Sequence, residues 1–352
     1  MRGVQRHRKG LLTGIIIALT CICSEWCRAQ EIDFLHPFPM YPLGPASDTL
    51  EICILGDMMM HTAQIENAHR NGQEYDFSSY FRFLEDRIRH ADIAIANMEF
   101  TLAGEPYSGY PAFSAPDEYA TYLSMLGIDV FLTANNHIFD KGAAGAQRTI
   151  NMFRELGVNM TGIAENQEEH DEAFPLIMKC KGASIAMLNV TYGTNAGIGK
   201  EWPKIMRLSE KEAMAEALAK ADTCDFVLVL PHWGEEYTLK HSQTQESYAR
   251  WFVKQGADAI VGAHPHVIQD IQEIDGTPVF YSIGNAVSNM SAANTQMELM
   301  VTLKIVRYHN GNIKLLKPEY ELLWCSRPGG FCSRYTGAAR KISKTYLLSS
   351  VT

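Results

Sequence analysis

Five short clusters of acidic, amide and histidine residues hold most of the chemistry in this sequence. Each cluster follows a short apolar run rich in Ile, Val and Leu, such as Ile93 to Ala96 or Phe226 to Leu230. Such runs predict buried strands, and an α/β sheet builds its functional site at the carboxyl ends of its strands. The clusters are Gly56-Asp57-Met58-Met59, Asn97-Met98-Glu99, Asn135-Asn136-His137, His232-Trp233-Gly234-Glu235-Glu236 and His264-Pro265-His266.

Together these side chains form a ligand set for divalent metal ions. Carboxylate, amide and imidazole ligands suit Mn²⁺, Zn²⁺ or Fe²⁺ better than Ca²⁺ alone. Two ions about 3.5 to 4 Å apart need a bridging carboxylate and further ligands from several directions. The candidate ligands are Asp57, Glu99, Asn136, His232, His264 and His266. This inventory is sufficient for two ions that share one bridge.

The pair His264 and His266 is the most specific of these patterns. One residue separates the two histidines, so on an extended segment both rings point to the same side of the backbone. Other clusters have ordinary alternatives when taken alone. Gly56-Asp57 is also typical of a strand-ending turn, and Asn135-Asn136 of a helix cap. The joint pattern of all five clusters favours the metal site.

The first 29 residues predict a cleaved export signal. Arg6 and Lys9 belong to a basic head, and the run from Leu11 to Cys23 is apolar. Cys27-Arg28-Ala29 then has the small-x-small pattern that precedes a cleavage site, which predicts cleavage after Ala29. The apolar run is short for a membrane span, and an uncleaved anchor is the alternative. We expect the mature chain to be exported to the periplasm or the cell surface.

The mature chain is acidic. Residues 1–29 carry five Lys/Arg and one Asp/Glu, so the 31 basic and 40 acidic residues become 26 and 39, a formal net charge of −13. This charge disfavours nucleic acid and an anionic membrane surface as partners. A polyanionic substrate would need local positive charge, which bound metal ions could supply.

Five of the eight cysteines lie beyond the export signal. Cys53, Cys180 and Cys224 lie in or beside apolar segments and are expected to be small buried side chains. Cys325 and Cys332 flank a Gly-rich turn, and in an oxidising compartment they either form a disulfide or stay free. No Cys-x-x-Cys pair occurs, so neither a zinc ribbon nor a redox motif is supported.

Residues 50–320 predict one layered α/β domain, because short apolar runs alternate with helical stretches. Helices are expected at Ser79–His90, Pro116–Leu126, Gly145–Leu156, Ser209–Ala221 and Gln243–Gln255. Met297–Val306 and Ile313–Leu316 are joined at Asn310-Gly311-Asn312, which predicts a hairpin. Residues 30–49 carry four prolines and predict an extended lead-in, and residues 321–352 predict a peripheral tail.

The clusters resemble the signature of the CapA family, which is named for poly-γ-glutamate capsule synthesis and is related to the calcineurin-like metallophosphoesterases. The resemblance runs from about residue 50 to 290 and includes Tyr281-Ser282-Ile283-Gly284-Asn285. Tyr107 to Pro111 and Thr191 to Asn195 look like the branch common in Bacteroidetes. The resemblance implies a four-layer α/β/β/α sandwich of two mixed sheets, similar to a metallophosphoesterase.

The resemblance also implies a role for each matched residue. Asp57 and His266 would hold the first metal ion, and Glu99 would bridge both ions. The second ion would be held by Asn136, His232 and His264. His137 would stabilise the developing charge or protonate the leaving group. Residues that would support the ligands or contact substrate are Asn97, Asn135, Asp140, Glu235, Glu236 and Asn285.

Two positions depart from the wider superfamily. Its first motif is Asp-x-His, but Met59 stands at the third position, and a thioether is a poor ligand for a hard divalent ion. Glu99 stands where the superfamily has Asp, which lengthens the bridging arm by one methylene. A single tightly bound ion is therefore an alternative to two.

These features predict an exported metal-dependent hydrolase or transferase. It would act on a phosphoester or a γ-glutamyl amide bond through metal-activated water and His137 as general acid. The resemblance and the export signal imply that this reaction belongs to capsule or envelope polymer biosynthesis. The expected partners are the polymer or its precursor and a capsule-synthesis membrane complex. The alternative is a non-catalytic, metal-bearing assembly or tethering factor for an exported polymer. No Gly-x-Ser-x-Gly motif supports a serine hydrolase.

Overall fold

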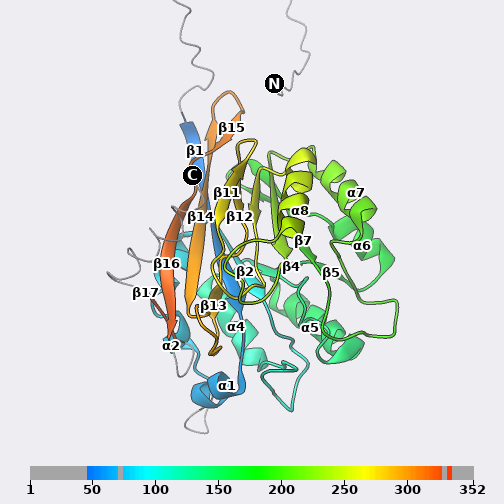
Figure 1. The fold of residues 1–352 in the computed structure, drawn as a ribbon, viewed down its shortest axis with the longest axis vertical. Coiled ribbons are helices and arrows are strands. Elements are labelled where there is room, and N and C mark those ends of the chain that lie inside the picture. Colours follow the sequence, from blue (N-terminus) through cyan, green and yellow to red (C-terminus); the bar gives the residue numbers. More distant parts are fainter. Residues whose placement is uncertain (1–45, 70–73, 327–330, 335–352) are drawn as a thin grey trace, which may run out of the picture. The chain divides into compact units, whose positions relative to one another are not determined.

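The computed structural model describes residues 46–69, 74–326 and 331–334. The predicted export signal and the lead-in up to residue 45 lie outside these residues. Within them the strands form a nine-stranded sheet, a six-stranded sheet and a two-stranded sheet (Figure 1). No helix in this part of the chain has the length and apolar character needed to cross a membrane.

The nine-stranded sheet is mixed, because β1 pairs in parallel with β2 and β13 and in antiparallel with β14. Its order is β17 (Phe331–Arg334), β16 (Glu319–Ser326), β14 (Met297–Tyr308), β1 (Ala46–Met58), β2 (Ile93–Met98), β3 (Val130–Leu132) and β4 (Asn159–Thr161), with β13 (Asn285–Val287) beside β1 and β15 (Ile313–Leu315) beside β14. The parallel strands β1, β2, β3 and β4 send their carboxyl ends to the same edge.

The six-stranded sheet is also mixed, with four parallel inner strands between two antiparallel edge strands. Its order is β11 (Ile271–Ile274), β12 (Thr277–Phe280), β10 (Ala259–Val261), β9 (Phe226–His232), β7 (Ala183–Thr191) and β6 (Leu176–Cys180). The short strands β5 (Ile163–Ala164) and β8 (Lys204–Ile205) form the two-stranded sheet.

Three apolar cores divide the described residues into four layers. Successive strand residues face opposite sides of a sheet, so in β1 the side chains of Ile52 and Ile54 pack against the six-stranded sheet, whereas Cys53 and Leu55 pack against helices. The helices on the nine-stranded sheet are α1 (Thr62–Ala68), α2 (Ser78–Phe81), α3 (Glu85–His90), α4 (Asp117–Leu126) and α5 (Gly142–Leu156). Helices α6 (Gln167–Ala173), α7 (Lys211–Ala221) and α8 (Gln243–Lys254) accompany the six-stranded sheet (Figure 1). The predicted α/β/β/α sandwich is confirmed.

Two parts of the sequence prediction are wrong. Residues 321–326 and 331–334, which we expected in a peripheral tail, belong to β16 and β17 and pair at the edge of the nine-stranded sheet. The helix expected over Ser79–His90 is broken into α2 and α3, and the break lets Tyr80 and Leu84, both 0% exposed, reach the same core. The predicted hairpin is confirmed by β14 and β15, with Gly311 at φ 84° in the turn.

The cysteines follow the sequence prediction in part. Cys53 and Cys224 are buried, and Cys180 is half-buried. Cys325 is a free thiol, although its backbone pairs with Cys332 across β16 and β17. Its Sγ donates to the Ser288 carbonyl at 3.2 Å, so the thiol is satisfied by a buried hydrogen bond.

Replacing Leu228 by alanine tests the core between the two sheets. Leu228 is 0% exposed on β9, so Leu228→Ala should lower the free energy of unfolding by about 2 to 5 kcal/mol because it leaves a cavity. Urea unfolding would measure the loss. The control is Met125→Ala on α4, where the side chain is 73% exposed, and the expected change is below about 0.5 kcal/mol. Equal losses of unfolding free energy in the two variants would contradict the packing of Leu228 between the two sheets.

Candidate metal centre

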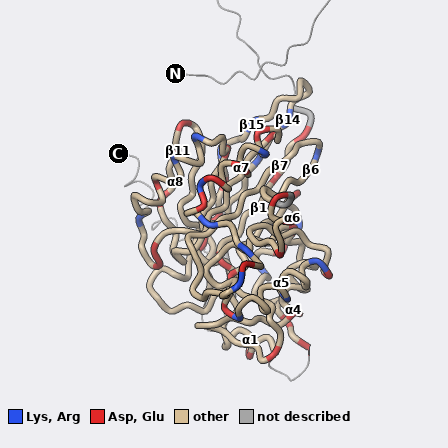
Figure 2. The backbone as a smooth tube through the Cα atoms, turned by 90° about the vertical axis from the view of Figure 1, so that its right-hand side faces the viewer, with Lys and Arg blue, Asp and Glu red and all other residues tan. Residues whose placement is uncertain are grey.

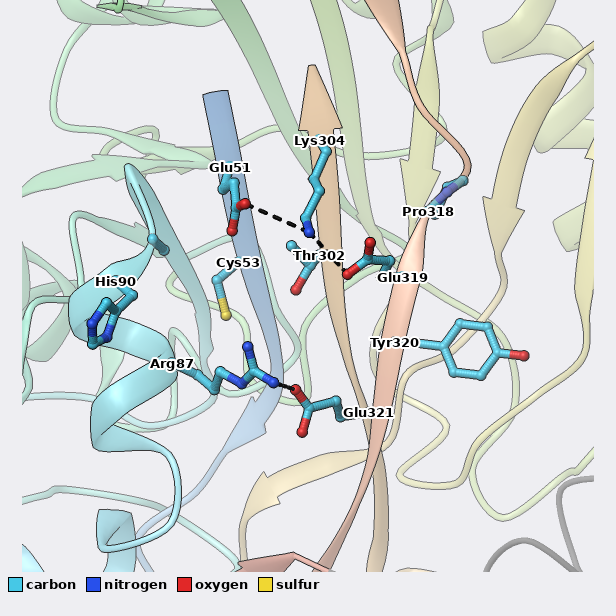
Figure 3. Close-up of a pocket in the computed structure, with 11 residues that line it drawn as sticks. Glu51, Cys53, Arg87, His90, Thr302, Lys304, Pro318, Glu319, Tyr320 and Glu321 are labelled. Carbon is cyan, nitrogen blue, oxygen red and sulfur yellow. Dashed lines mark ion pairs between the residues drawn. The ribbon is translucent and has the colours of Figure 1, made fainter. Parts of the chain in front are cut away.

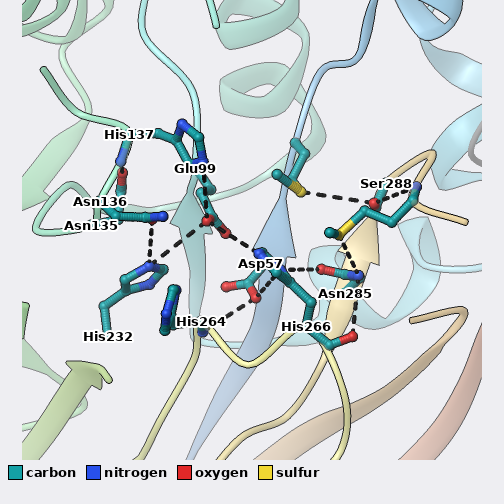
Figure 4. A network of polar contacts seen from close by, with 12 residues as sticks. Asp57, Glu99, Asn135, Asn136, His137, His232, His264, His266, Asn285 and Ser288 are labelled. Atoms are coloured by element: carbon teal, nitrogen blue, oxygen red, sulfur yellow. Dashed lines mark hydrogen bonds and ion pairs between the residues drawn. The ribbon is translucent and has the colours of Figure 1, made fainter. Parts of the chain in front are cut away.

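The structure brings all six predicted ligands together at the carboxyl ends of parallel strands (Figure 4). They come from β1, β2, β3, β9 and β10 or from the residues that directly follow these strands, so both sheets contribute. None is more than 3% exposed: Asp57, Glu99, Asn136, His232, His264 and His266.

The donor atoms of these residues form two groups that share one carboxylate. The first group is Asp57, Glu99 and His266, and the second is Glu99, His232 and His264, with the donor atoms of each group within 4.8 Å of one another. Glu99 Oε1 lies 3.8 Å from His232 Nε2 and 3.6 Å from His266 Nε2. Asn136 Oδ1 lies 2.9 Å from His232 Nε2, which places the amide beside the second group. The shared carboxylate is the arrangement that a two-ion site requires.

The sheet register places Asp57 between two supporting amides. Asp57 pairs with Asn97 across β1 and β2, and with Asn285 across β1 and β13. Asn97 Nδ2 donates to Asp57 Oδ1 at 2.6 Å. A Cβ at Gly56 would lie 2.0 Å from the Gly284 carbonyl oxygen, so only glycine lets β1 pass this close to β13.

His266 is oriented by hydrogen bonds on one side of its ring. Its Nδ1 lies 3.0 Å from Asp57 Oδ2 and 2.9 Å from Asn285 Oδ1. The Asn285 amide nitrogen donates to the carbonyls of His266 and Thr295, so its oxygen is an acceptor and Nδ1 carries the hydrogen. This leaves Nε2, which faces Glu99, as the atom that could hold a metal ion.

The segment of the two histidines is not extended, as we had expected. His264 and His266 have φ values of 99° and 56°, in the left-handed region that residues with side chains rarely adopt. Hydrogen bonds hold this turn in place: the backbone N–H of His264 donates to Asp57 Oδ2 at 3.3 Å, and the Pro265 carbonyl accepts from the N–H of Tyr237 at 2.8 Å. Strained backbone of this kind is often found at functional sites.

Unsatisfied buried atoms show that the site fits divalent metal ions. Both carboxylate oxygens of Glu99 accept no hydrogen bond, and His264 Nδ1 and Asn136 Nδ2 also lack a partner. Burial raises the pKa of Glu99 well above its usual value, and Asp57 adds to this, although His266 opposes it. Leaving such groups unpaired in a protein interior costs free energy. Cations held by the two groups would satisfy the carboxylate oxygens and the His264 nitrogen.

The imidazoles differ in their affinity for protons. Burial lowers the pKa of His232 well below its usual value and that of His264 to about 3, and the neighbouring histidines add to both effects. These two rings are therefore neutral at pH 7, the form that binds metal. Burial alone would lower the pKa of His266 as well, but the carboxylates of Glu99 and Asp57 raise it to about 10. A metal ion at His266 would displace that proton.

His137 faces the same centre from the loop after β3. Its Nδ1 lies 2.7 Å from Asp140 Oδ2, and its Nε2 lies 4.0 Å from Glu99 Oε1. Asn135 Oδ1 accepts from the backbone N–H of His137 at 3.0 Å, and the Phe113 ring packs edge-on against the imidazole at 4.8 Å. The ring is fixed with Nε2 toward the ligand groups, in the position that a proton donor would need.

Of the two remaining predicted residues, Glu235 and Glu236, only Glu236 reaches the ligand groups. Glu235 and Glu236 are both exposed. Glu236 groups with His264 and His266, whereas Glu235 belongs to none of the groups found among the described residues. Met59 is 1% exposed and packs in the core between the nine-stranded sheet and its helices, where its Sδ accepts from Ser288 Oγ at 3.8 Å.

Sequence reasoning missed several residues that shape the site. Asn189 Oδ1 accepts from the N–H of Ala134 at 2.7 Å and so links β7 to the loop after β3. Tyr192 packs its ring 4.6 Å from that of His264, and Asn195 Nδ2 lies 3.4 Å from His137 Nε2. Tyr192 and Asn195 were noted only as part of a family pattern, and a lone Asn within an apolar strand gives no local indication of its contacts.

A cavity of about 400 Å³ lies elsewhere, over β1, β14, β16 and α3 (Figure 3). None of the predicted site residues lines it. Its charged groups pair with one another: Arg87 with Glu321, and Lys304 with Glu51 at 3.6 Å and with Glu319 at 3.1 Å. The cavity is therefore distinct from the metal centre.

Comparisons with a family model and with known proteins point to the same family. A family model described as bacterial capsule synthesis protein PGA_cap matches residues 51–290. The capsule biosynthesis protein CapA of Bacillus anthracis is 30% identical over 299 residues, which cover 81% of this chain and 70% of that protein. The PGA biosynthesis protein CapA of Bacillus subtilis is 26% identical over 282 residues, which cover 77% and 71%.

Solved structures with some similarity include two nucleotidases. Haemophilus influenzae NAD nucleotidase (NadN) has a TM-score of 0.47 and 16% identity, and the match covers 86% of this chain and 63% of that chain. The 5'-nucleotidase from Candida albicans has a TM-score of 0.45 and 11% identity, with 78% and 52% covered. This chain thus spans less than two thirds of either nucleotidase.

Proposed function

This chain belongs to the family of bacterial capsule synthesis proteins that includes CapA, and from this premise we propose that it is an exported metal-dependent hydrolase or transferase. Its substrate would be a capsule or envelope polymer, or a precursor of one. The observation that carries the proposal is Glu99, a fully buried carboxylate that is shared by two ligand groups and has no hydrogen-bond partner.

The chain's own residues support a reaction at this point. When bound, two divalent ions would polarise the bond that is attacked and lower the pKa of water. Asn97 and Asn285 keep Asp57 and His266 in place through short hydrogen bonds. Asp140 holds His137 so that its Nε2 faces the centre, where it would donate a proton to the leaving group.

The charge of the site favours a substrate that becomes anionic where it reacts. Among the described residues, the ion pairs of Asp57 and Glu99 are all with histidines, so bound ions would be the main positive charge. A phosphoester and a γ-glutamyl amide both develop negative oxygen in the transition state. We propose these two bond types as the substrates to test first. Figure 2 shows Lys and Arg interspersed with Asp and Glu along the described part of the chain.

Metal analysis of the mature chain, purified without chelator, tests this proposal. We expect about two divalent ions per chain and a clear loss in His264→Ala, which removes a ligand of the second group. The loaded protein should hydrolyse bis(p-nitrophenyl) phosphate or γ-glutamyl-p-nitroanilide. Absence of bound metal, even after addition of Mn²⁺, Zn²⁺ or Fe²⁺, would contradict the proposal that the chain is a metal-dependent enzyme.

A second candidate function is an assembly or tethering factor for an exported polymer. Met59 favours it, because its side chain lies in the core and leaves the first ligand group with only three residues. In such a factor the bound metal would be structural or would serve binding. The two functions differ in turnover, which the replacement of His137 tests directly.

A further inference from the structure

An exposed loop brings a third carboxylate to the metal centre. Glu236 lies between β9 and α8, and its carboxylate forms a group with His264 and His266 in which the donor atoms lie within 4.8 Å of one another. Unlike Asp57 and Glu99, Glu236 is exposed to solvent.

Hydrogen bonds tie this loop to the segment that carries the two histidines. The N–H of Tyr237 donates to the Pro265 carbonyl at 2.8 Å, and Gln269 Nε2 donates to the Thr238 carbonyl at 2.7 Å. Tyr237 has a φ of 63°, an uncommon value for a residue with a side chain. The position of Glu236 is therefore built into the fold and is not that of a free surface acid.

The first ligand group has room for one more ligand. It contains Asp57, Glu99 and His266, whereas the second group contains Glu99, His232 and His264 with Asn136 beside them. Transition-metal ions of this class take at least about four ligands. Met59 cannot supply the fourth, because its sulfur packs in the core and accepts a hydrogen bond from Ser288.

We propose that Glu236 is a metal ligand that completes the first ion's coordination in place of the imidazole that Met59 does not provide. The inference rests on the proposed metal centre. Charge supports it, since Asp57 and Glu99 carry two negative charges against the four positive charges of two divalent ions, and a third carboxylate reduces that excess. The proposed ligand is the exposed member of its group, whereas His264 and His266 are buried.

Titration of the metal-free mature chain with Mn²⁺ tests this, because electron paramagnetic resonance counts the free and bound ions. We expect the unmodified chain to bind two ions and Glu236→Gln to keep one tight ion while the other binds at least about tenfold more weakly. The matched control is Glu216→Gln, which changes an exposed acid on α7 that belongs to none of the ligand groups and should bind like the unmodified chain. Equal affinity in Glu236→Gln would overturn this inference alone. Failure of the unmodified chain to bind any ion would overturn the metal centre as well.

A double variant tests which ion Glu236 holds. If Asp57 and Glu236 bind the same ion, Asp57→Asn combined with Glu236→Gln should still hold one ion per chain, as each single variant does. Loss of both ions in the double variant would place Glu236 on the second ion and overturn the assignment. Circular dichroism of each variant would verify that the chain is folded.

Discussion

Glu99→Gln is expected to remove both metal ions, with at least about a 100-fold loss of affinity for each. Glutamine keeps the size of the side chain but removes the charge that two cations would share. Because Glu99 belongs to both ligand groups, its loss should affect both ions. His266→Ala should mainly affect the first ion and His264→Ala the second. Elemental analysis of the purified variants would measure the bound metal.

The same replacement should stabilise the metal-free protein. Glu99 is fully buried, accepts no hydrogen bond and has a raised pKa, so at neutral pH the folded protein must either bury a charge or keep the carboxyl group protonated, and both cost free energy that a neutral amide avoids. The melting temperature of Glu99→Gln should therefore exceed that of the metal-free unmodified chain and should not rise with added Mn²⁺. Glu298→Gln is the control for the loss of metal. Burial also raises the pKa of Glu298, to about 8, but Glu298 belongs to neither ligand group. Two ions retained in Glu99→Gln would contradict the shared carboxylate.

Local patterns were sufficient to predict which candidate ligands gather at one edge of the sheets, because each follows the end of an apolar run. Such a run fixes where a strand ends, and parallel strands then bring distant residues to one edge. The alternation along the chain predicted a layered α/β domain, and the four-layer α/β/β/α order came from the family resemblance. The contacts could not be predicted in this way, because the pairing of Asp57 with Asn97 and Asn285 depends on strand register across the sheet.

The failures have tertiary causes. His264 and His266 reach the site through a left-handed turn that is held by contacts with Asp57 and with the loop of Tyr237. No periodicity in the sequence predicts that turn. Strand β16 was overlooked because the Gly-, Ser- and Arg-rich residues that follow it dominate the composition of this region. In the structure, pairing with β14 determines that it is a strand.

His137→Gln is expected to abolish turnover while both metal ions and polymer binding remain. Loss of a general acid lowers the rate by about 10²- to 10⁴-fold, and His137 belongs to neither ligand group, so metal content should not change. The chain offers a matched control in His241, whose Nδ1 also lies 2.7 Å from an aspartate, Asp270. His241→Gln removes the same kind of pair outside the metal centre and should leave turnover unaffected.

Three measurements on these two variants separate the proposed enzyme from the tethering factor. Hydrolysis of a chromogenic phosphodiester and of a γ-glutamyl anilide reports turnover, elemental analysis reports the metal, and sedimentation with purified capsule polymer reports binding. An enzyme should lose only turnover in His137→Gln. Undiminished turnover would contradict the proton-donor role of His137, whose ring is held by Asp140 with Nε2 toward Glu99. Polymer binding without turnover in the unmodified, metal-loaded chain would favour the tethering factor, because the same ligand groups would then serve structure or binding.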